Sequence, residues 1–383
     1  MEPLVVLSRC AAENSSKELL SCNRDLHRSD LICKYPSQLL PSHHATLDAI
    51  SQCRTAAIGT TTWRCEDCRE LKTVPLSCGH RHCPTCQNHE STDWLERQVD
   101  KSLPINYLMV TFTLPAQLHH TLFSHQKTLY SLFFDVVIDT LKSFAMTTKR
   151  FNGQLGMTAV LHTHSRKLDY HPHIHVLIPA LAIHPSKSQF QRCKGKYLFN
   201  VKSLATVYRA RFLAAINKTN ISMPEGVPSQ WNVHCQPVGR GEESLQYLAR
   251  YLYRGVISEH RILTCQNGMV EFEFLCSKTK RYQRLTLPAT QFLWKVLVHV
   301  LPRGFQRARC YGFLHHNCRV LLKRIQLMLQ VVLPEVSSDI GKTATVTCPG
   351  CQRPMTLVNV SRTKRRLPRC QSVSGPPLLE NTN

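Results

Sequence analysis

The chain has 383 residues, more than one ordinary domain usually holds and a length that suits two or three. Hydrophobic residues make up 43% of it, enough for packed cores, so a wholly disordered protein is excluded. Lysine and arginine number 48 against 25 acidic residues, and the resulting formal charge of +23 favours a polyanionic partner, with nucleic acid as the first candidate.

The N-terminal part shows few signs of ordinary folding. Residues 1–38 have no clear periodicity and stay unassigned. A short helix is predicted over 39–52, with Ser42 as a possible N-cap. Residues 53–90 are rich in cysteine and histidine and poor in apolar residues, so this segment can fold only around metal. We therefore place a zinc-binding domain at 39–95.

A second domain is predicted over residues 100–330. A buried strand at 107–114 ends before Pro115, and helical periodicity covers 118–147. The later segments alternate irregularly between strand and helix. Strands are expected at 157–164, 172–179, 231–235, 256–263 and 269–275, and helices at 201–217, 242–254 and 287–300. This order favours an α+β fold with a mainly antiparallel sheet over a doubly wound fold. Residues 331–383 read as a basic tail that contains a C-x2-C pair.

The cellular compartment decides how the 18 cysteines are interpreted. No basic segment followed by an apolar core opens the chain, and no uncharged apolar run reaches the roughly 18 residues of a membrane helix. We therefore expect a cytoplasmic protein without membrane contact, in which thiols stay reduced. Paired cysteines are then metal ligands before they are disulfides.

Two C-x2-C knuckles are separated by 14 residues, a spacing close to that of double-knuckle zinc sites. Tetrahedral zinc prefers four soft ligands, and each knuckle offers two thiolates. The predicted ligands of this structural zinc are Cys65, Cys68, Cys83 and Cys86. Further candidates for a second zinc surround them, although one zinc with spare ligands is an equal alternative. These candidates are Cys53, Cys78 and His82, with His80 beside them.

Cys348 and Cys351 form another C-x2-C pair near the C-terminus. The pair is half of a zinc site, and Cys318 or Cys370 could supply more of it. Neither spacing is diagnostic, so a free thiol pair is an equal alternative.

A histidine-rich strand gives the most specific signal in the chain. Because side chains alternate along a strand, His171, His173 and His175 share one face. Two imidazoles at i and i+2 can bind one divalent ion. If 157–164 and 171–178 form a hairpin, His162 lies opposite His173 and is the first choice for a third ligand, while His164 would face His171. The alternative for any single histidine is an ordinary packed or solvated side chain.

A helix with two tyrosines gives the second signal. In the helix predicted over 242–254, Leu245, Leu248 and Leu252 belong to one apolar stripe. Tyr247 and Tyr251, at i and i+4, lie together away from this stripe. Tyrosine is a covalent nucleophile in phosphodiester chemistry, although tyrosines at helical spacing more often pack against another element.

Together, the two motifs resemble the HUH nuclease superfamily, with His173-Ile174-His175 as the His-hydrophobic-His strand and Tyr247-x-x-x-Tyr251 as the tyrosine pair. More narrowly, the chain resembles the two-tyrosine rolling-circle transposases of bacterial insertion sequences, of the IS ninety-one type. The resemblance covers about residues 39–355. Further matching stretches are Cys53-Arg54-Thr55-Ala56-Ala57, Arg81-His82-Cys83-Pro84-x-Cys86-Gln87, Leu161-His162-Thr163, His299-Val300-Leu301-Pro302-Arg303-Gly304-Phe305 and Tyr311-Gly312-Phe313-Leu314.

The resemblance implies a DNA-strand nuclease and transferase that acts on single-stranded or hairpin ends of its own element. It implies Mg²⁺ or Mn²⁺ held by His173, His175 and His162, which polarises the scissile phosphate. Behind His162, the other candidates for the third ligand are Glu243 and Gln246. Family members commonly carry tryptophan at the position of His164, which argues against His164 as a ligand.

The tyrosine pair takes its role from the same resemblance. Tyr247 or Tyr251 would attack the phosphate and leave a 5′-phosphotyrosine and a free 3′-OH, and the second tyrosine would permit a second exchange. The implied setting is the bacterial cytoplasm, in association with the nucleoid. Two alternatives stay open: a replication initiator or relaxase with the same chemistry, and a non-catalytic zinc DNA-binding protein. The basic runs 278–284 and 362–366 are candidates for phosphate contacts.

Overall fold

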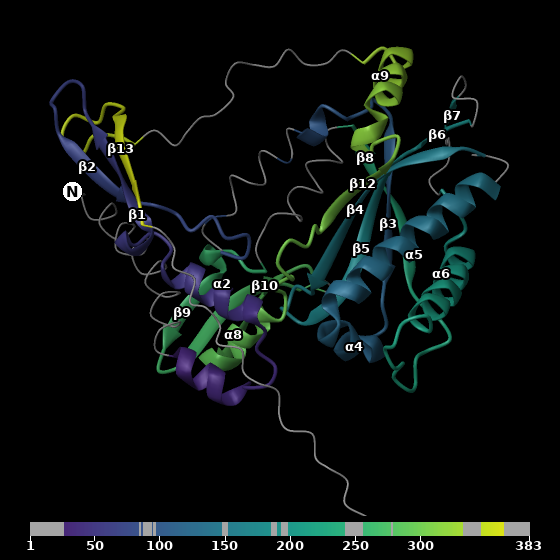
Figure 1. The fold of residues 1–383 in the computed structure, drawn as a ribbon, viewed down its shortest axis with the longest axis horizontal. Helices are drawn as coiled ribbons and strands as arrows, with labels where there is room; N and C mark the ends of the chain where they lie inside the picture. Colours follow the sequence, from purple (N-terminus) through teal and green to yellow (C-terminus); the bar gives the residue numbers. More distant parts are fainter. Residues whose placement is uncertain are drawn as a thin grey trace, which may run out of the picture. The chain divides into compact units, whose positions relative to one another are not determined.

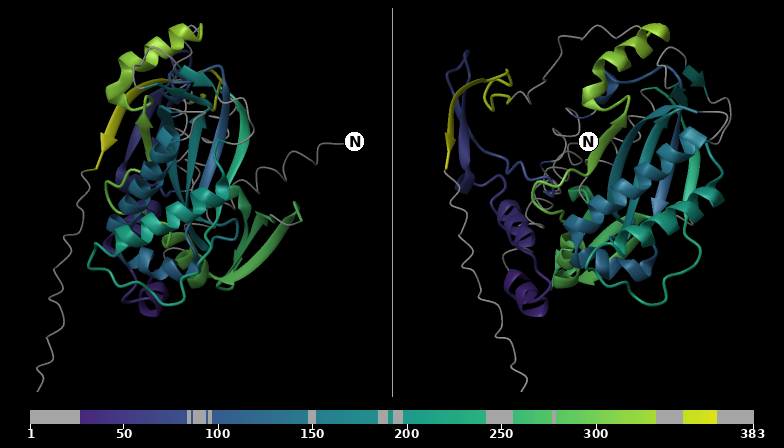
Figure 2. Two further views of the ribbon diagram at one scale, coloured as in Figure 1. Left: turned by 90° about the vertical axis from the view of Figure 1, so that its right-hand side faces the viewer. Right: turned by 45° about the vertical axis from the view of Figure 1, so that its right-hand side comes forward.

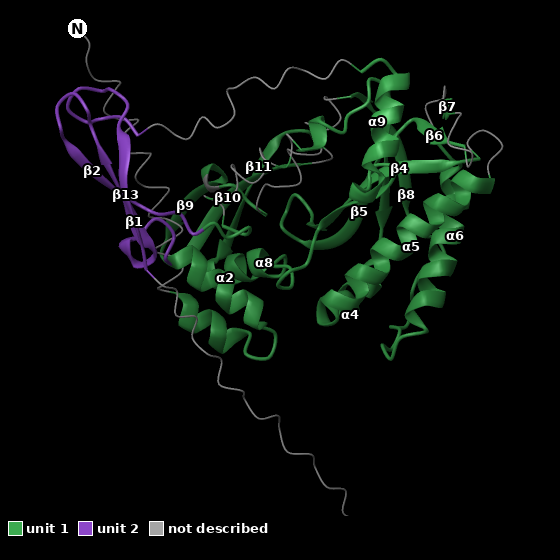
Figure 3. Cartoon of the chain, turned by 45° about the horizontal axis from the view of Figure 1, so that its top comes forward, with its two compact units in different colours: residues 1–51, 79–340 green, residues 52–78, 341–383 purple. Residues whose placement is uncertain are grey.

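The structure is a computed structural model, and it describes residues 27–83, 86, 94, 97–147, 152–184, 190–192, 198–241, 256–276, 279–331 and 346–363. The chain divides into two compact units, the first made of residues 1–51 and 79–340 and the second of residues 52–78 and 341–383 (Figure 3). In the described segments, no helix combines the length and the apolar character that a membrane crossing requires.

A seven-stranded sheet forms the centre of the first unit. Its order is β7-β6-β4-β5-β3-β8, and β12 also pairs with β4. Neighbouring strands are antiparallel throughout. The strands are β3 (Asn106–Thr113), β4 (Gln154–His164), β5 (Tyr170–Pro179), β6 (Leu181–Ile183), β7 (Phe190–Arg192), β8 (Val233–Arg240) and β12 (Ala308–Gly312).

Helices α5 (Gln126–Thr147) and α6 (Val201–Ile216) cover one face of this sheet (Figures 1 and 2). The short helix α4 (His119–Ser124) precedes α5 in the chain. Ile174 and Val176 of β5 belong to the same buried cluster as Phe133 of α5. The apolar positions of β5 therefore anchor the strand against the helices.

The opposite face of the sheet carries the alternate positions of β4 and β5. Val160 of β4 and Leu177 of β5 join a separate core with Ile325 of α9 (Arg319–Met328). Further along the same faces the two strands present histidines instead of apolar side chains. The period of two in the sequence thus places the histidines on the face away from α5 and α6.

A smaller sheet within the first unit has the order β11-β10-β9. Its buried residues pack with Phe292 of α8, and this core includes Leu168 from the turn between β4 and β5. Residues 27–34 are helical and precede α2. The elements are α2 (Pro41–Ser51), β9 (Ile262–Gln266), β10 (Met269–Leu275), β11 (Tyr282–Pro288) and α8 (Ala289–Leu297).

The second unit is built from two distant segments of the chain. Its three-stranded sheet has the order β13-β1-β2, so that β1 (Gly59–Arg64) lies between β2 (Leu71–Pro75) and β13 (Thr356–Arg362). Both pairings are antiparallel. The C-terminal strand therefore completes a sheet that the N-terminal hairpin begins, which gives unit boundaries different from the domain boundaries expected from the sequence.

The α+β class and the antiparallel sheet predicted from the sequence are confirmed. The strand at 107–114 and the strand at 269–275 appear as β3 and β10. Three details were wrong. The strand expected at 256–263 begins only at Ile262, as β9, after a 3-10 turn at Glu259–Arg261. Helix α2 begins at Pro41, so Ser42 is not its N-cap, and the region 287–300 contains the end of β11 before α8 begins at Ala289. The helix expected at 242–254 lies outside the described residues.

Candidate active site and cysteine clusters

Three histidines converge where β4 and β5 form a hairpin. His162 on β4 pairs with His173 on β5, as the expected hairpin requires. His175 follows two positions later on the same face of β5. One ring nitrogen from each of the three side chains lies within 4.8 Å of the others. Such a group can coordinate a single metal ion.

Hydrogen bonds at the outer ring nitrogens orient two of these imidazoles. Nδ1 of His173 donates to the backbone carbonyl of His171 over 2.7 Å, since a carbonyl oxygen can only accept. The proton is thereby fixed on Nδ1, and Nε2 keeps its lone pair. Nδ1 of His175 lies 2.8 Å from Oγ1 of Thr111 on β3. Outer contacts of this kind are typical of metal-binding histidines.

The third imidazole has an unmatched polar atom. His162 is buried, and among the described residues Nε2 of His162 has no hydrogen-bond partner. An unpaired buried nitrogen is costly, so native structures rarely keep one without a ligand, ion or water. The donor set therefore fits a bound cation.

The electrostatics of the site keep the three rings neutral. Burial lowers the pKa of His173 to about 4 and that of His175 to about 3. Burial, followed by the neighbouring His175 and His173, holds the pKa of His162 well below 6.5. Neutral imidazole is the form that binds metal, so no proton has to be displaced at pH 7.

His164 and His171 are not opposite each other, contrary to the expectation from an unbroken hairpin. The register shifts between His162 and His164, and His164 pairs with Tyr170 instead. The irregularity accounts for the missed pairing, because a bulge displaces every later partner. The ring of His164 stacks on that of His162 at 6.1 Å and contacts His299 at 5.6 Å.

The turn of the hairpin is attached to the smaller sheet's helix. Lys295 of α8 forms an ion pair with Asp169, Nζ to Oδ1 at 2.6 Å. Nε2 of the buried His299 lies 3.1 Å from the carbonyl oxygen of Leu168, to which it donates. These contacts fix the end of the hairpin that carries the histidines.

The remaining candidates for this site fall in one segment. Tyr247 and Tyr251, and the alternative ligands Glu243 and Gln246, lie outside the described residues. Their roles stay predictions.

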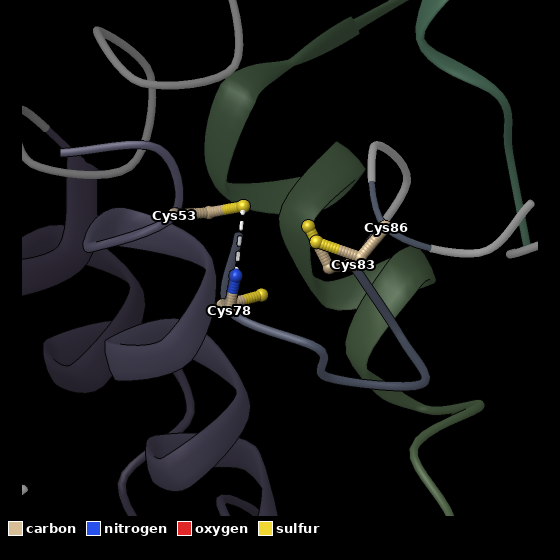
Figure 4. Close-up of side chains that lie close together, drawn as sticks. All are labelled: Cys53, Cys78, Cys83 and Cys86. Atoms are coloured by element: carbon tan, nitrogen blue, oxygen red, sulfur yellow. Dashed lines mark hydrogen bonds between the residues drawn. The ribbon is translucent and has the colours of Figure 1, made fainter. Parts of the chain in front are cut away.

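Four cysteines from residues 53–86 form a first sulfur cluster, shown in Figure 4. The sulfurs of Cys53, Cys78, Cys83 and Cys86 lie within 4.8 Å of one another. The backbone N–H of Cys78 also donates to Sγ of Cys53 over 3.5 Å. The cluster therefore combines the predicted knuckle Cys83/Cys86 with Cys53 and Cys78, which the sequence suggested as ligands of a second zinc.

The other knuckle belongs to a different cluster. Cys65 and Cys68 lie with Cys348 and Cys351, again with all four sulfurs within 4.8 Å. The structure thus divides the four predicted ligands of a single zinc between two clusters. Sequence spacing favoured the nearest pair, but strand pairing brings the C-terminal pair to the N-terminal hairpin.

His82 is not part of either cluster. Its Nε2 accepts a hydrogen bond from the backbone of Leu301 over 3.3 Å. Arg81 beside it donates to the carbonyl oxygens of Phe305 and Pro302 over 2.6 and 2.8 Å. The stretch around residue 81 therefore contacts the stretch around residue 301.

Sequence reasoning missed Thr111 and the pairing of Cys348 with the first knuckle. Thr111 could have been found from the pairing of β3 with β5, which places Thr111 beside His175. For the pairing of Cys348 with the first knuckle, the only signal in the sequence was that both segments have the C-x2-C spacing.

Comparison with known proteins identifies the family. Residues 13–114 match the model described as "Transposase zinc-binding domain", Zn_Tnp_IS91, and residues 156–320 match the model described as "Putative transposase", Y2_Tnp. A curated relative from Sinorhizobium fredii, named "Putative transposase y4qJ", is 30% identical over 306 residues, which are 74% of this chain and 77% of the relative. The chain belongs to the IS91 family of transposases.

Two further matches accompany this assignment. The transposase for insertion sequence element IS801 from Pseudomonas savastanoi pv. phaseolicola is 25% identical over 311 residues, 76% of this chain and 74% of that protein. A solved structure of TrwC, complexed with a 27-mer DNA comprising the recognition hairpin and the cleavage site, matches with a TM-score of 0.26 and 15% identity. That match covers 58% of this chain and 73% of TrwC. The two family models and the two curated relatives confirm the family identified from the order of the sequence motifs.

Proposed function

We propose that this IS91-family transposase cuts and rejoins single DNA strands at the ends of its own element through a 5′-phosphotyrosine intermediate. One observation carries the proposal: His162, His173 and His175 bring three neutral imidazoles to one point on a family member's sheet. A metal-binding group of this kind suits phosphoryl transfer, in which charge on the phosphate must be stabilised.

The three histidines would hold Mg²⁺ or Mn²⁺. A divalent ion there supplies electrostatic stabilisation for the scissile phosphate. Because imidazole is a softer ligand than oxygen, we expect this site to bind Mn²⁺ more tightly than Mg²⁺. The hydrogen bonds from His173 to the carbonyl of His171 and between His175 and Thr111 fix the orientation of the ligands.

The tyrosine pair would supply the nucleophile. The phenol oxygen of Tyr247 or Tyr251 forms the new bond to phosphorus while the bond from phosphorus to the 3′ oxygen breaks. The phenol loses its proton and the 3′ oxygen gains one, so the products are a 5′-phosphotyrosine and a 3′-OH. The phosphodiester energy is kept in the new ester, and the second tyrosine permits a second transfer without release of the first strand.

The hairpin of β10 and β11 offers a surface for single-stranded DNA. Lys280, Arg281 and Arg284 are exposed there. Tyr282 is 58% exposed, and the guanidinium of Arg261 lies 5.6 Å from its ring centroid. Exposed aromatic rings among cations are typical of proteins that stack bases and contact phosphates. The proposed setting is the bacterial cytoplasm, where the element's own DNA is found.

The family's zinc-binding region would have its zinc at the first cysteine cluster. All four cysteines, Cys53, Cys78, Cys83 and Cys86, fall within the matched residues 13–114. Four thiolates are the ligand set of structural zinc. We propose that this zinc shapes a module for DNA binding or assembly.

Mapping of a covalent adduct tests the proposed function. The full-length protein is incubated with Mn²⁺ and labelled single-stranded DNA that carries the element's ends, denatured and digested. We expect the DNA on Tyr247 or Tyr251, and no adduct from the double variant Tyr247→Phe/Tyr251→Phe, which keeps both rings. Tyr253→Phe is the matched control, since that ring lies on another side of the predicted helix.

Three results would contradict the proposal. DNA attached to a tyrosine outside the pair would refute the assignment of the nucleophile. Absence of any adduct in active-site-intact protein that binds the same DNA would indicate a non-catalytic DNA-binding protein. Cleavage without joining of one element end to a second DNA strand would favour a replication initiator or relaxase.

A further inference from the structure

Two turns of the second unit have the same backbone geometry. In the first, the N–H of Cys65 bonds to the carbonyl of Glu70, and the N–H of Arg69 bonds back to the carbonyl of Cys65. In the second, Cys348 bonds to Arg353, and Gln352 bonds back to Cys348, in the same manner. The fifth residue of each turn is left-handed, with φ of 61° at Arg69 and 60° at Gln352. Each turn therefore presents two sulfurs, at its first and fourth positions.

The two turns face each other through their sulfurs. Sγ of Cys65 lies 3.4 Å from Sγ of Cys351, and Sγ of Cys68 lies 3.4 Å from that of Cys348 and 3.8 Å from that of Cys351. A zinc–sulfur bond of about 2.3 Å places neighbouring sulfurs of a tetrahedron about 3.8 Å apart. The observed spacing is close to that of a zinc site and far longer than a disulfide bond.

The turn alone does not indicate metal. Cys276 and Arg281, between β10 and β11, form the same pair of backbone bonds, and Lys280 is left-handed there too. The fourth position of that turn is Thr279, so it presents one sulfur and not two. The indication in the second unit is the meeting of two turns that each carry a cysteine pair.

Acidic side chains lie beside the cluster. Oε2 of Glu70 lies 3.4 Å from Sγ of Cys348. Asp67, within the first turn, is paired with Arg353 of the second, Oδ1 to Nη1 at 2.7 Å. Zinc binds cysteine as thiolate, and a divalent ion would offset the repulsion of four thiolates beside the Glu70 carboxylate.

The core of the second unit is too small to hold its sheet by apolar burial. Among its described residues, the buried cluster consists of Cys65, Cys348 and Met355. Every residue of β13 is exposed. Small sheets of this kind usually need a metal or a disulfide to fold.

We propose that the cysteines of these two turns, Cys65, Cys68, Cys348 and Cys351, hold one structural zinc ion. This site is separate from the cluster of Figure 4. Its C-terminal half lies beyond both family-matched regions, which end at residues 114 and 320. The ion joins β13 to the hairpin of β1 and β2, and so makes residues 346–363 part of a zinc-stabilised sheet.

Zinc counting in serine variants tests whether the two turns share one ion. Cys65→Ser and Cys348→Ser should each remove one zinc per chain from the purified full-length protein. The double variant should remove no more than either single change, because both ligands serve the same ion. Cys33→Ser, at an exposed cysteine outside both clusters, is the control and should keep the full zinc content. A Cys348→Ser protein with unchanged zinc, or a double variant that loses two ions, would overturn the proposal.

Alkylation of the unmodified protein covers the case in which a variant fails to fold. Cys68, Cys351 and Cys33 are all exposed. In zinc-loaded protein, Cys68 and Cys351 should resist iodoacetamide at least about tenfold better than Cys33, because metal binding occupies the thiolate. A chelator should then make Cys68 and Cys351 reactive. If Cys351 reacts as fast as Cys33 while zinc is bound, the cysteines form only a thiol cluster and the proposal fails. Neither experiment depends on strand transfer, so the result stands whether or not the proposed function holds.

Discussion

The hydroxyl of Thr111 is a positioning group for His175. It lies 2.8 Å from Nδ1 of that ring and can accept a hydrogen bond from Nδ1–H, which selects the tautomer whose Nε2 keeps its lone pair. Thr111→Val keeps the shape and the strand propensity of the side chain but removes the oxygen. Loss of such an outer contact typically costs 10- to 100-fold in metal affinity. We therefore expect the Mn²⁺ concentration for half-maximal cleavage to rise about tenfold, with DNA binding unchanged.

Thr113→Val is the matched control for this change. Thr113 is on the same strand and pairs with His173, whose Nδ1 is already bonded to the carbonyl of His171. An equal rise in the Mn²⁺ requirement for both variants would show a general effect of strand packing. An unchanged requirement in Thr111→Val would show that the hydroxyl does not orient the ligand.

At the scale of elements, β12 approaches β4 so closely that one position requires glycine. Gly312 has a φ of 62°, and a side chain on it would overlap with the carbonyl oxygen of Leu155. Backbone cannot move aside as a flexible side chain can. We expect Gly312→Ala to lower the free energy of unfolding by at least about 3 kcal/mol, measured by chemical denaturation.

Gly304→Ala separates the steric effect from the cost of the left-handed backbone. Gly304 has a similar φ of 75°, but a side chain there would meet nothing within 4 Å. This variant should lose only about 1 to 2 kcal/mol, the usual cost of a left-handed non-glycine residue. If the two variants were equally stable, the close approach of β12 to Leu155 would not constrain the fold.

The secondary structure could be predicted where periodicity was simple. The alternation in 171–178 indicated both the helix-facing residues and the histidines on the opposite face, and it placed His162 opposite His173. It could not reveal the bulge that moves His164 to Tyr170, because a one-residue irregularity leaves no mark on hydrophobic alternation. The sequence pattern predicts helix from 287 because the last residues of β11 run directly into the apolar residues of α8.

At the scale of the whole molecule, the pairing of segments far apart in the chain could not be predicted from the sequence. Cys68 and Cys348 are 280 positions apart, and ligand spacing favours near neighbours. The antiparallel pairing of β1 with β13 brings them together, and nothing in the local sequence of either segment specifies that partner.

The charge of +23 has a consequence for DNA affinity that can be measured. Each phosphate contact on a single strand releases counterions, and the affinity falls with a logarithmic slope of about −0.7 per contact. For about five contacts, we expect affinity to fall roughly a hundredfold between 50 and 200 mM salt. Fluorescence anisotropy with a labelled single strand measures this slope. A slope near zero would contradict binding through phosphates.

The central claim is that His162, His173 and His175 hold the divalent ion that strand cleavage requires. Its most direct test is the rate of covalent adduct formation on a single-stranded element end in Mn²⁺, with DNA affinity measured in parallel. The double variant His173→Ala/His175→Ala should form no detectable adduct, because it lacks two ligands of the ion. Its DNA affinity should stay within about threefold of that of the unaltered protein, because the phosphate contacts are kept. His171→Ala is the matched control, because it lies on the same strand outside the triad and keeps the carbonyl that His173 uses; it should retain adduct formation. An undiminished rate in the double variant would contradict the account.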